Sequence, residues 1–144
     1  MKVEREVHID APPQTIYEVI MDAQRLGDWV TIHQGLEDAP GGTLRKGSTL
    51  TQRLKLAGRS FKVHWKVVEN DRAERVVWEG EGPVRSRAKV IYDLTADGEG
   101  TRFSYTNEYH LPGGALGKMA GPAVRRITGG ELDRSLEALK HLFE

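Results

Sequence analysis

From Ser48 to Tyr109 the chain alternates apolar and polar residues with a period of two, and this pattern constrains the fold more than any other feature. Turn-forming residues interrupt the alternation at four places: Ala57-Gly58, Asn70-Asp71, Gly82-Pro83 and Asp97-Gly98-Glu99-Gly100. Short strands joined by tight turns predict β-hairpins, and therefore an antiparallel meander. Because each strand has one apolar and one charged face, we expect one face of the sheet to be covered.

Helical spacing appears at both ends of the chain. After a predicted strand over residues 3–9, apolar residues at positions 16, 17, 19 and 20 predict a first helix, and residues 23–28 a second, short one. The last segment carries two apolar stripes, one over Leu116, Met119, Ala123 and Ile127 and one over Leu132, Leu136, Leu139 and Phe143. On one ideal helix these stripes lie roughly half a turn apart. We therefore predict a long C-terminal helix over the sheet, with a bend or break near Gly129-Gly130.

Composition and charge restrict the class of protein. The 144 residues fit a single α+β domain over residues 1–144. Lys plus Arg and Asp plus Glu both number 21, and this balance argues against a nucleic-acid-binding protein. The absence of cysteine excludes disulfides and thiolate catalysis. With no signal-peptide core and no apolar run of membrane-spanning length, we expect a cytoplasmic protein, monomeric or weakly homodimeric.

The charged face of the predicted sheet carries an ordered pattern. Glu79 and Glu81 lie on a strand between a basic strand over residues 62–66 and another over residues 85–89. Opposite charges on neighbouring strands are mildly favourable, so we interpret this as a solvated outer face. A basic docking surface for a macromolecule is the alternative.

The apolar face contains polar exceptions. Six residues predicted to point inward carry polar groups, namely Gln52, Ser86, Asn107, Tyr92, Tyr105 and Tyr109. Buried polar groups cost free energy unless they are hydrogen-bonded, and a filled core would avoid so many. Trp65 and Trp78 point inward from adjacent strands as well. We interpret the set as the wall of a cavity, in which a few polar groups orient an apolar ligand.

Motifs of conventional chemistry are missing from the sequence. The five histidines have no metal-ligand spacing, and no nucleophile elbow occurs. Gly80-Glu81-Gly82 lacks the strand-turn-helix context of a dinucleotide loop. We therefore predict neither a metal nor a cofactor.

Several segments, in their order and spacing, resemble a known superfamily. They are Val7-His8-Ile9-Asp10-Ala11-Pro12, Ile16-Tyr17, Asp28-Trp29, Gly47-Ser48, Trp78-Glu79-Gly80, Gly100-Thr101-Arg102 and Ser135-Leu136-Glu137-Ala138-Leu139-Lys140. The chain resembles the START-like, or SRPBCC, superfamily over nearly its whole length, and most of all its polyketide cyclase/dehydrase and coenzyme Q-binding-protein group. This resemblance implies a helix-grip fold, with a curved antiparallel sheet of about seven strands around a long C-terminal helix and two short helices after the first strand.

The resemblance also implies a function, since members bind lipids, quinones, sterols or polyketides and some are aromatase/cyclases. Our leading hypothesis is a protein that binds a hydrophobic small molecule between sheet and C-terminal helix. The alternatives are a polyketide cyclase/dehydrase, with Tyr105, Tyr109 and His33 as candidate acid-base groups, and a macromolecular interaction protein. The predicted ligand-binding residues are Trp29, Gln52, Leu54, Trp65, Val67, Trp78, Ser86, Ala88, Tyr92, Tyr105, Asn107, Tyr109, Met119 and Ala123.

Overall fold

A computed structural model describes the backbone of residues 1–110 and 114–144, and the side chains of residues 1–110 and 122–144. A single antiparallel sheet of seven strands forms the body of the protein. The strands are β1 Lys2–Ile9, β2 His33–Glu37, β3 Thr49–Leu56, β4 Arg59–Asp71, β5 Arg75–Glu81, β6 Arg87–Asp97 and β7 Gly100–His110. Their order in space is β1-β7-β6-β5-β4-β3-β2, so consecutive strands are neighbours from β2 to β7 and β1 joins the far edge. This confirms the predicted meander and the predicted number of strands.

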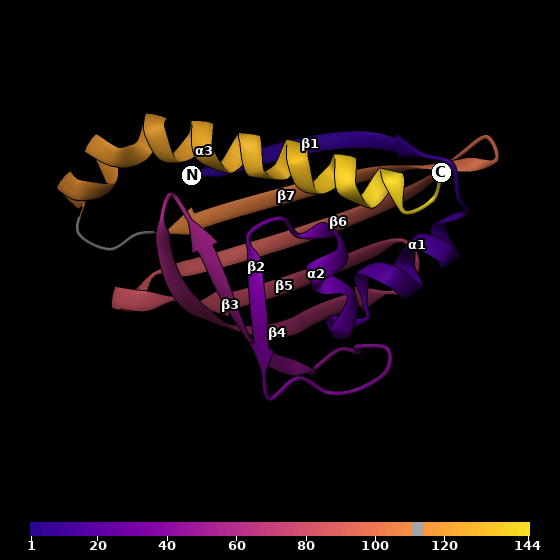
Figure 1. Ribbon diagram of the computed structural model, residues 1–144, viewed down its shortest axis with the longest axis horizontal. Helices are drawn as coiled ribbons and strands as arrows, with labels where there is room; N and C mark the ends of the chain where they lie inside the picture. The colour runs from indigo at the N-terminus through magenta and orange to yellow at the C-terminus, as the bar shows by residue number, and fades with distance from the viewer. Residues whose placement is uncertain (111–113) are drawn as a thin grey trace.

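The helices cover one side of this sheet. α1 (Pro13–Ile20), the short turn η1 (Ala23–Arg25) and α2 (Leu26–Trp29) follow β1, and α3 (Gly114–His141) ends the chain. The sheet curves, and α3 runs along β1 and β7 while α1 and α2 lie below its C-terminal part (Figure 1). The predicted helix-grip arrangement, including the two short helices after the first strand, is confirmed.

Strand register confirms the charge pattern on the outer face. Lys66 and His64 of β4 pair with Glu79 and Glu81 of β5. The same two glutamates pair with Lys89 and Arg87 of β6 on their other side. The acidic strand therefore lies between two basic ones, and the face is locally neutralised.

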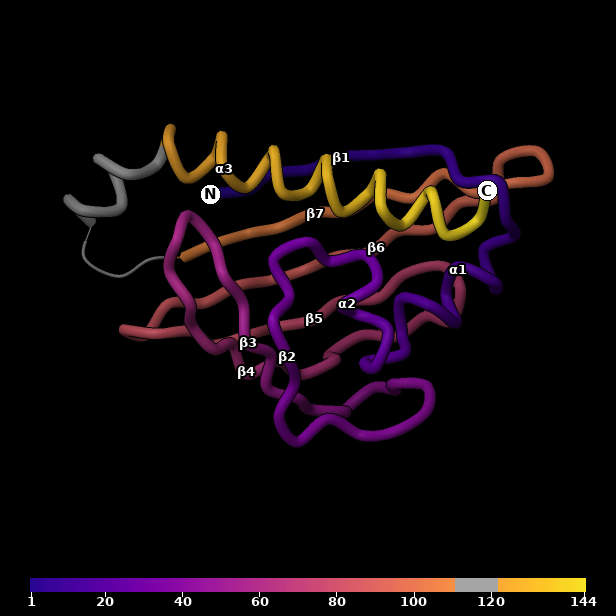
Figure 2. The backbone as a smooth tube through the Cα atoms, viewed as in Figure 1, coloured from indigo at the N-terminus to yellow at the C-terminus, as the bar shows by residue number. Residues whose placement is uncertain are grey.

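The predicted bend near Gly129-Gly130 is wrong, because α3 continues through both glycines as one helix (Figure 2). The close approach of β1 accounts for Gly129: a Cβ atom there would lie 2.5 Å from Nη2 of Arg5 and 3.9 Å from Cγ1 of Val3. The members of the two stripes within residues 122–144 lie on different sides of the unbroken helix. Leu132 is fully buried, whereas Ile127 is 37% exposed.

The start of β6 also differs from the prediction. The alternation predicts a strand from residue 84, but Pro83–Arg85 form a short 3-10 turn (η2). Val84 has a φ of 56° and is 85% exposed, so it lies at the tip of the β5–β6 hairpin instead of on the inner face. Pro83, whose ring fixes φ, is tolerated in such a turn and not within a central strand.

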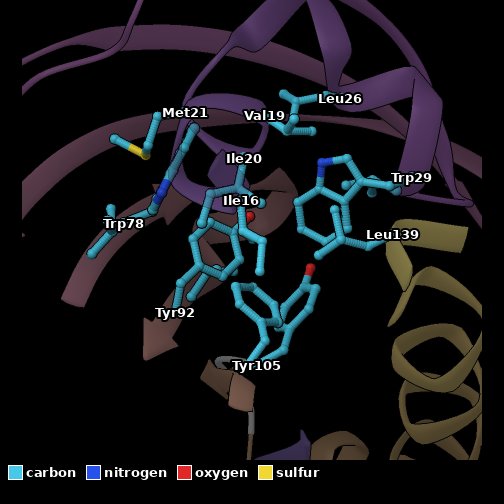
Figure 3. Packing of buried hydrophobic residues seen from close by; sticks show 14 of the residues in the cluster. Ile16, Val19, Ile20, Met21, Leu26, Trp29, Trp78, Tyr92, Tyr105 and Leu139 are labelled. Atoms are coloured by element: carbon cyan, nitrogen blue, oxygen red, sulfur yellow. The ribbon is translucent and has the colours of Figure 1, made fainter. Parts of the chain in front are cut away.

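Aromatic side chains fill the space between the sheet and the short helices (Figure 3). Trp29 at the end of α2 is 1% exposed and packs edge-on against Phe103 and Tyr105, with ring centroids 6.4 and 5.7 Å away. Its ring also lies 5.7 Å from that of Tyr92. The C-terminal part of α3 adds Leu139, which is fully buried. Trp29 thus joins α2 to the sheet and forms one side of the interior.

Candidate functional site

A small cavity of about 30 Å³ lies between the inner face of the sheet and α2. Its wall combines side chains of α2 and its C-cap with those of the central strands: Leu26, Val30, Gln52, Trp65, Trp78, Val90, Tyr92 and Tyr105. Trp65 and Trp78 meet edge to face with centroids 6.2 Å apart. Trp65 can lie against β5 because position 80 is a glycine, where a Cβ would be 2.6 Å from its Cε3 atom. The wall is mostly aromatic and aliphatic, which suits an apolar ligand.

Three polar side chains at this wall, those of Trp65, Gln52 and His33, are hydrogen-bonded to one another. The indole nitrogen of Trp65 donates to Oε1 of Gln52 at 3.0 Å. The Gln52 amide nitrogen in turn donates to Nδ1 of His33 at 2.9 Å, which places the proton of a neutral His33 ring on Nε2. Burial, with a contribution from Arg53, lowers the pKa of His33 and favours that neutral ring. Gln52 is therefore fixed in orientation by both of its neighbours.

Other polar atoms near the cavity have no protein partner. In the described part of the chain, the indole nitrogens of Trp78 and Trp29 are buried without a hydrogen-bond acceptor. An unpaired buried N–H group costs about 1–3 kcal/mol, so such groups are rare. Trp78 is one of the residues that line the cavity.

The helix α3 carries a buried glutamate, Glu131. Glu131 is 2% exposed, and its Oε1 accepts a hydrogen bond from the Ser135 hydroxyl. Burial raises the pKa of Glu131, while the Ser135 hydrogen bond and the Arg134 charge partly offset this increase. Burial, and next the nearby Glu131 charge, raises the pKa of the Tyr92 and Tyr105 hydroxyls, both of which line the cavity. The charge of Glu131 therefore acts on two hydroxyls of the cavity wall.

The predicted ligand-binding residues divide into three groups. Five line the cavity: Gln52, Trp65, Trp78, Tyr92 and Tyr105. Six others are buried or half-buried in the same inner layer, namely Trp29, Leu54, Val67, Ala88, Asn107 and Tyr109. The structure does not bring the remaining described residues, Ser86 and Ala123, into the cavity, and the side chain of Met119 lies outside the described residues.

Local geometry explains the two misplaced residues. The Ser86 hydroxyl donates to the carbonyl oxygen of Pro83 at 2.7 Å and so closes the η2 turn. Ala123 is exposed, because nine residues on an unbroken helix place it about 180° from Leu132.

The candidate acid-base groups are not assembled into one cluster. Tyr105 lines the cavity, and His33 reaches it only through Gln52. Tyr109 is half-buried further along β7, and burial raises its pKa to about 12. Sequence reasoning missed three residues of the cavity wall, namely Leu26, Val30 and Val90.

A larger open groove of about 330 Å³ runs along β3 and β4. Its lining includes the charged side chains of Asp38 and Lys66 together with His64, whose Nδ1 is hydrogen-bonded to Thr51 at 2.8 Å. These polar and charged groups make the groove less suitable for an apolar ligand than the inner cavity.

The described residues contain no group of three or more His, Asp or Glu side chains placed to hold a metal ion. No helix among them is long and apolar enough to span a membrane.

Comparison with known proteins agrees with this geometry. Residues 1–144 match the family described as polyketide cyclase / dehydrase and lipid transport. The chain belongs to this family. An uncharacterized protein of Mycobacterium tuberculosis, Rv1546, is 24% identical over 141 residues, which cover 98% of this chain and 97% of that protein. The toxin Rv0910 of the same organism is 22% identical over 142 residues, which cover 99% and 97%.

Solved structures of family-like proteins confirm the START-like fold. A START superfamily protein from Mycobacterium smegmatis superposes with a TM-score of 0.79 at 18% identity, covering 99% of this chain and 96% of its own. TTHA0849 from Thermus thermophilus also gives 0.79, at 21% identity and with 98% and 95% covered. Ginseng major latex-like protein 151 gives 0.73 at 12% identity, with 99% and 97% covered. Family and fold together support a role in binding a hydrophobic ligand.

The raised pKa of Glu131 gives a pH-dependent prediction for stability. The folded state holds the Glu131 proton more tightly than the unfolded state, whose pKa is near the ordinary value of 4.5. The stability gained from a neutral Glu131 is therefore complete below pH 4.5 and is lost as the pH rises through the folded pKa. Glu131→Gln, which is neutral at every pH, should become progressively more stable than the wild type across this range, as measured by urea unfolding.

Groups facing Glu131 do not interfere with this measurement. The pKa values of Tyr92, Tyr105 and Tyr109 are raised above the ordinary value of 10.0, beyond the pH range of this measurement. Glu99→Gln, the same change at an exposed position between β6 and β7, is the control for the removal of one carboxyl group. A stability difference between Glu131→Gln and wild type that does not vary with pH would contradict the burial of an ionisable Glu131.

Proposed function

We propose that the protein binds a hydrophobic small molecule, such as a lipid, a quinone or a polyketide-like molecule, in the cavity between the sheet and its covering helices. The observation that carries the proposal is the composition of the wall, in which aromatic and aliphatic side chains surround the unpaired indole N–H group of Trp78. An apolar ligand with one hydrogen-bonding group would bury its surface there and satisfy this donor. Membership of a family described by cyclisation, dehydration and lipid transport supports the same class of ligand.

The cavity volume sets a condition on binding. About 30 Å³ suffices for one or two water molecules but not for a lipid or a quinone. A ligand of that size must therefore displace side chains or move the elements that close the cavity. Binding by expansion of a small cavity predicts slower association than binding to an open pocket.

A matched pair of substitutions tests the proposal. Val90→Phe places a ring in the cavity, whereas Val84→Phe makes the same change at an 85% exposed position. We expect Val90→Phe to weaken binding of 1-naphthol at least tenfold, about 1.4 kcal/mol, and Val84→Phe to leave it unchanged, as measured by isothermal titration calorimetry. Native mass spectrometry of protein purified gently from its host should show an adduct that organic solvent removes. No adduct and no naphthol binding would overturn the proposal.

The second candidate function is a cyclase or dehydrase acting on a polyketide-like substrate. It is favoured by Tyr105, a cavity-wall hydroxyl whose raised pKa keeps it protonated, so that it could donate a hydrogen bond to a substrate carbonyl oxygen. His33 would act from further away, through Gln52. Unchanged turnover of a poly-β-keto substrate after Tyr105→Phe, Tyr109→Phe and His33→Ala would eliminate these groups as catalysts.

The remaining expectations stay predictions. They are a cytoplasmic location, a monomer or weak homodimer and no association with nucleic acid, with a macromolecular interaction protein as the third hypothesis for function. Size-exclusion chromatography with light scattering checks the second of these directly.

A further inference from the structure

Charge is divided between the two ends of the sheet. Successive turns of an antiparallel meander lie at alternate ends, so the β3–β4 and β5–β6 turns share one end and the β4–β5 and β6–β7 turns share the other (Figure 1). Residues 55–60 and 82–87, around the first two turns, carry four basic and no acidic side chains. Residues 71–74 and 97–100, around the other two, carry four acidic side chains and one basic side chain. The formal net charge of zero is therefore the sum of a basic end and an acidic end.

The basic end has cations without acidic partners. Its four basic side chains, Lys55, Arg59, Arg85 and Arg87, are exposed. Among the described residues, none of the four takes part in a salt bridge. Of the four, only Arg87 has an acidic residue, Glu81, opposite it in the strand register. This end of the sheet therefore attracts anionic surfaces.

An apolar side chain projects from the β5–β6 turn between these cations. Val84 is 85% exposed, and Pro83 beside it is exposed as well. Val84 and Arg85 have φ values of 56° and 59°, a left-handed conformation that is a genuine outlier for a β-branched residue. The Ser86 hydroxyl and backbone N–H close the turn by donating to the carbonyl oxygen of Pro83, at 2.7 and 3.1 Å. The fold thus maintains a strained backbone that exposes a valine to solvent.

The strain at Val84 indicates a function for this turn. Strained backbone costs stability and is concentrated at functional sites, whereas glycine or asparagine at position 84 would relieve it. A valine flanked by arginines suits the boundary of a lipid bilayer, where an apolar side chain enters the headgroup layer and cations contact lipid phosphates. A nucleic acid would use the cations but would leave the exposed valine without a role.

We propose that the basic end of the sheet docks on a membrane surface that contains anionic lipids. Val84 enters the headgroup layer, and Lys55, Arg59, Arg85 and Arg87 contact the lipid phosphates. The acidic turns at the other end are repelled by the same surface, so the molecule is oriented with its basic end toward the membrane. None of these five residues lines the cavity. Docking therefore goes beyond the proposed function, and each can fail while the other stands.

Vesicle co-sedimentation at low ionic strength tests the docking. The probes are vesicles of phosphatidylcholine alone and vesicles of equal parts phosphatidylcholine and phosphatidylglycerol. The wild type should bind the anionic vesicles roughly tenfold more tightly than the neutral ones, and high salt should abolish the difference. Arg85→Glu should weaken binding to the anionic vesicles about fivefold. Arg102→Glu, the same change at an exposed position of the acidic end, is the control and should bind as the wild type does.

A second substitution separates docking from folding. Asparagine tolerates the left-handed conformation, so Val84→Asn should unfold in urea with a free energy equal to or above that of the wild type. The same change removes the apolar group and should weaken binding to the anionic vesicles about fivefold. Naphthol binding should be unchanged in Arg85→Glu, because the cavity is intact. The proposal is overturned if the wild type does not bind the anionic vesicles, or if Arg85→Glu and Val84→Asn bind them as tightly as the wild type. Binding of duplex DNA in place of the vesicles would also overturn it, and would assign the basic end to a nucleic acid.

Discussion

Trp29→Ala should lower the free energy of unfolding by about 3–5 kcal/mol, the largest loss expected for a single side chain in this protein. Trp29 is 1% exposed and contacts three aromatic rings of β6 and β7, so its removal leaves a cavity that rigid strands cannot close. Urea unfolding followed by circular dichroism measures the loss. A change below about 1 kcal/mol would mean that α2 is not anchored through this ring.

Trp29→Phe is the matched control for this prediction. Phenylalanine retains one ring and removes an indole N–H that has no acceptor among the described residues. Part of the packing loss is therefore offset, and we expect less than half of the effect of Trp29→Ala. A loss as large as that of the alanine variant would indicate a hydrogen bond that the indole nitrogen makes and that this account lacks.

Leu132→Ala should have the second largest effect, a loss of about 2–5 kcal/mol in the free energy of unfolding. Leu132 is fully buried on the inward stripe of α3. Ile127→Ala and Leu142→Ala remove comparable apolar side chains that are 37% and 39% exposed, and each should cost less than about 1 kcal/mol. Urea unfolding of the three variants tests which side of α3 faces the core.

The outcome that contradicts this prediction concerns the course of α3. If Ile127→Ala were as destabilising as Leu132→Ala, both stripes would face inward and the helix would have to bend near Gly129. The unbroken helix requires the opposite, because positions 127 and 132 are separated by roughly 140° on a regular α-helix.

Much of the fold could be predicted from the sequence because its signals are local. Alternation with a period of two, together with turn residues at regular intervals, predicts a meander, and strand register follows once the turns are placed. The pairing of Glu79 with Lys66 and Lys89 is a direct consequence. The pairing of β1 with β7 is not indicated by any local pattern, and only the resemblance to the family predicts it.

Two predictions about the fold were wrong, one at Gly129-Gly130 and one at Val84. Gly129-Gly130 has the signature of a helix break, but Gly129 instead allows Arg5 of β1 to approach α3 closely. Val84 continues an alternating pattern, yet the neighbouring Pro83 turns the chain and exposes it. The contact between Gly129 and Arg5 cannot be read from the residues next to Gly129 in sequence, whereas the turn that exposes Val84 is local and follows from Pro83.

Only some of the residues in and around the cavity could be predicted from the sequence. Gln52, Tyr92 and Tyr105 stand out as polar groups on an apolar face, so a sequence pattern identifies them. Glu131 does not stand out, since it is one charged residue in a helix rich in charges. A signal was nevertheless present: Glu131 is adjacent to Leu132 and four residues before Ser135, on the same buried stripe as Leu136.

The central claim is that an apolar ligand binds inside the sheet and not on its outer face. Heteronuclear NMR spectra of isotopically labelled protein, recorded during titration with 1-naphthol, test it most directly. The account predicts progressive shifts of the Trp65 and Trp78 indole N–H signals, because both rings line the inner cavity, with little change at the backbone amides of His64 and Lys66. Shifts confined to His64, Lys66 and the neighbouring residues of the outer groove, with both indole signals unmoved, would contradict it.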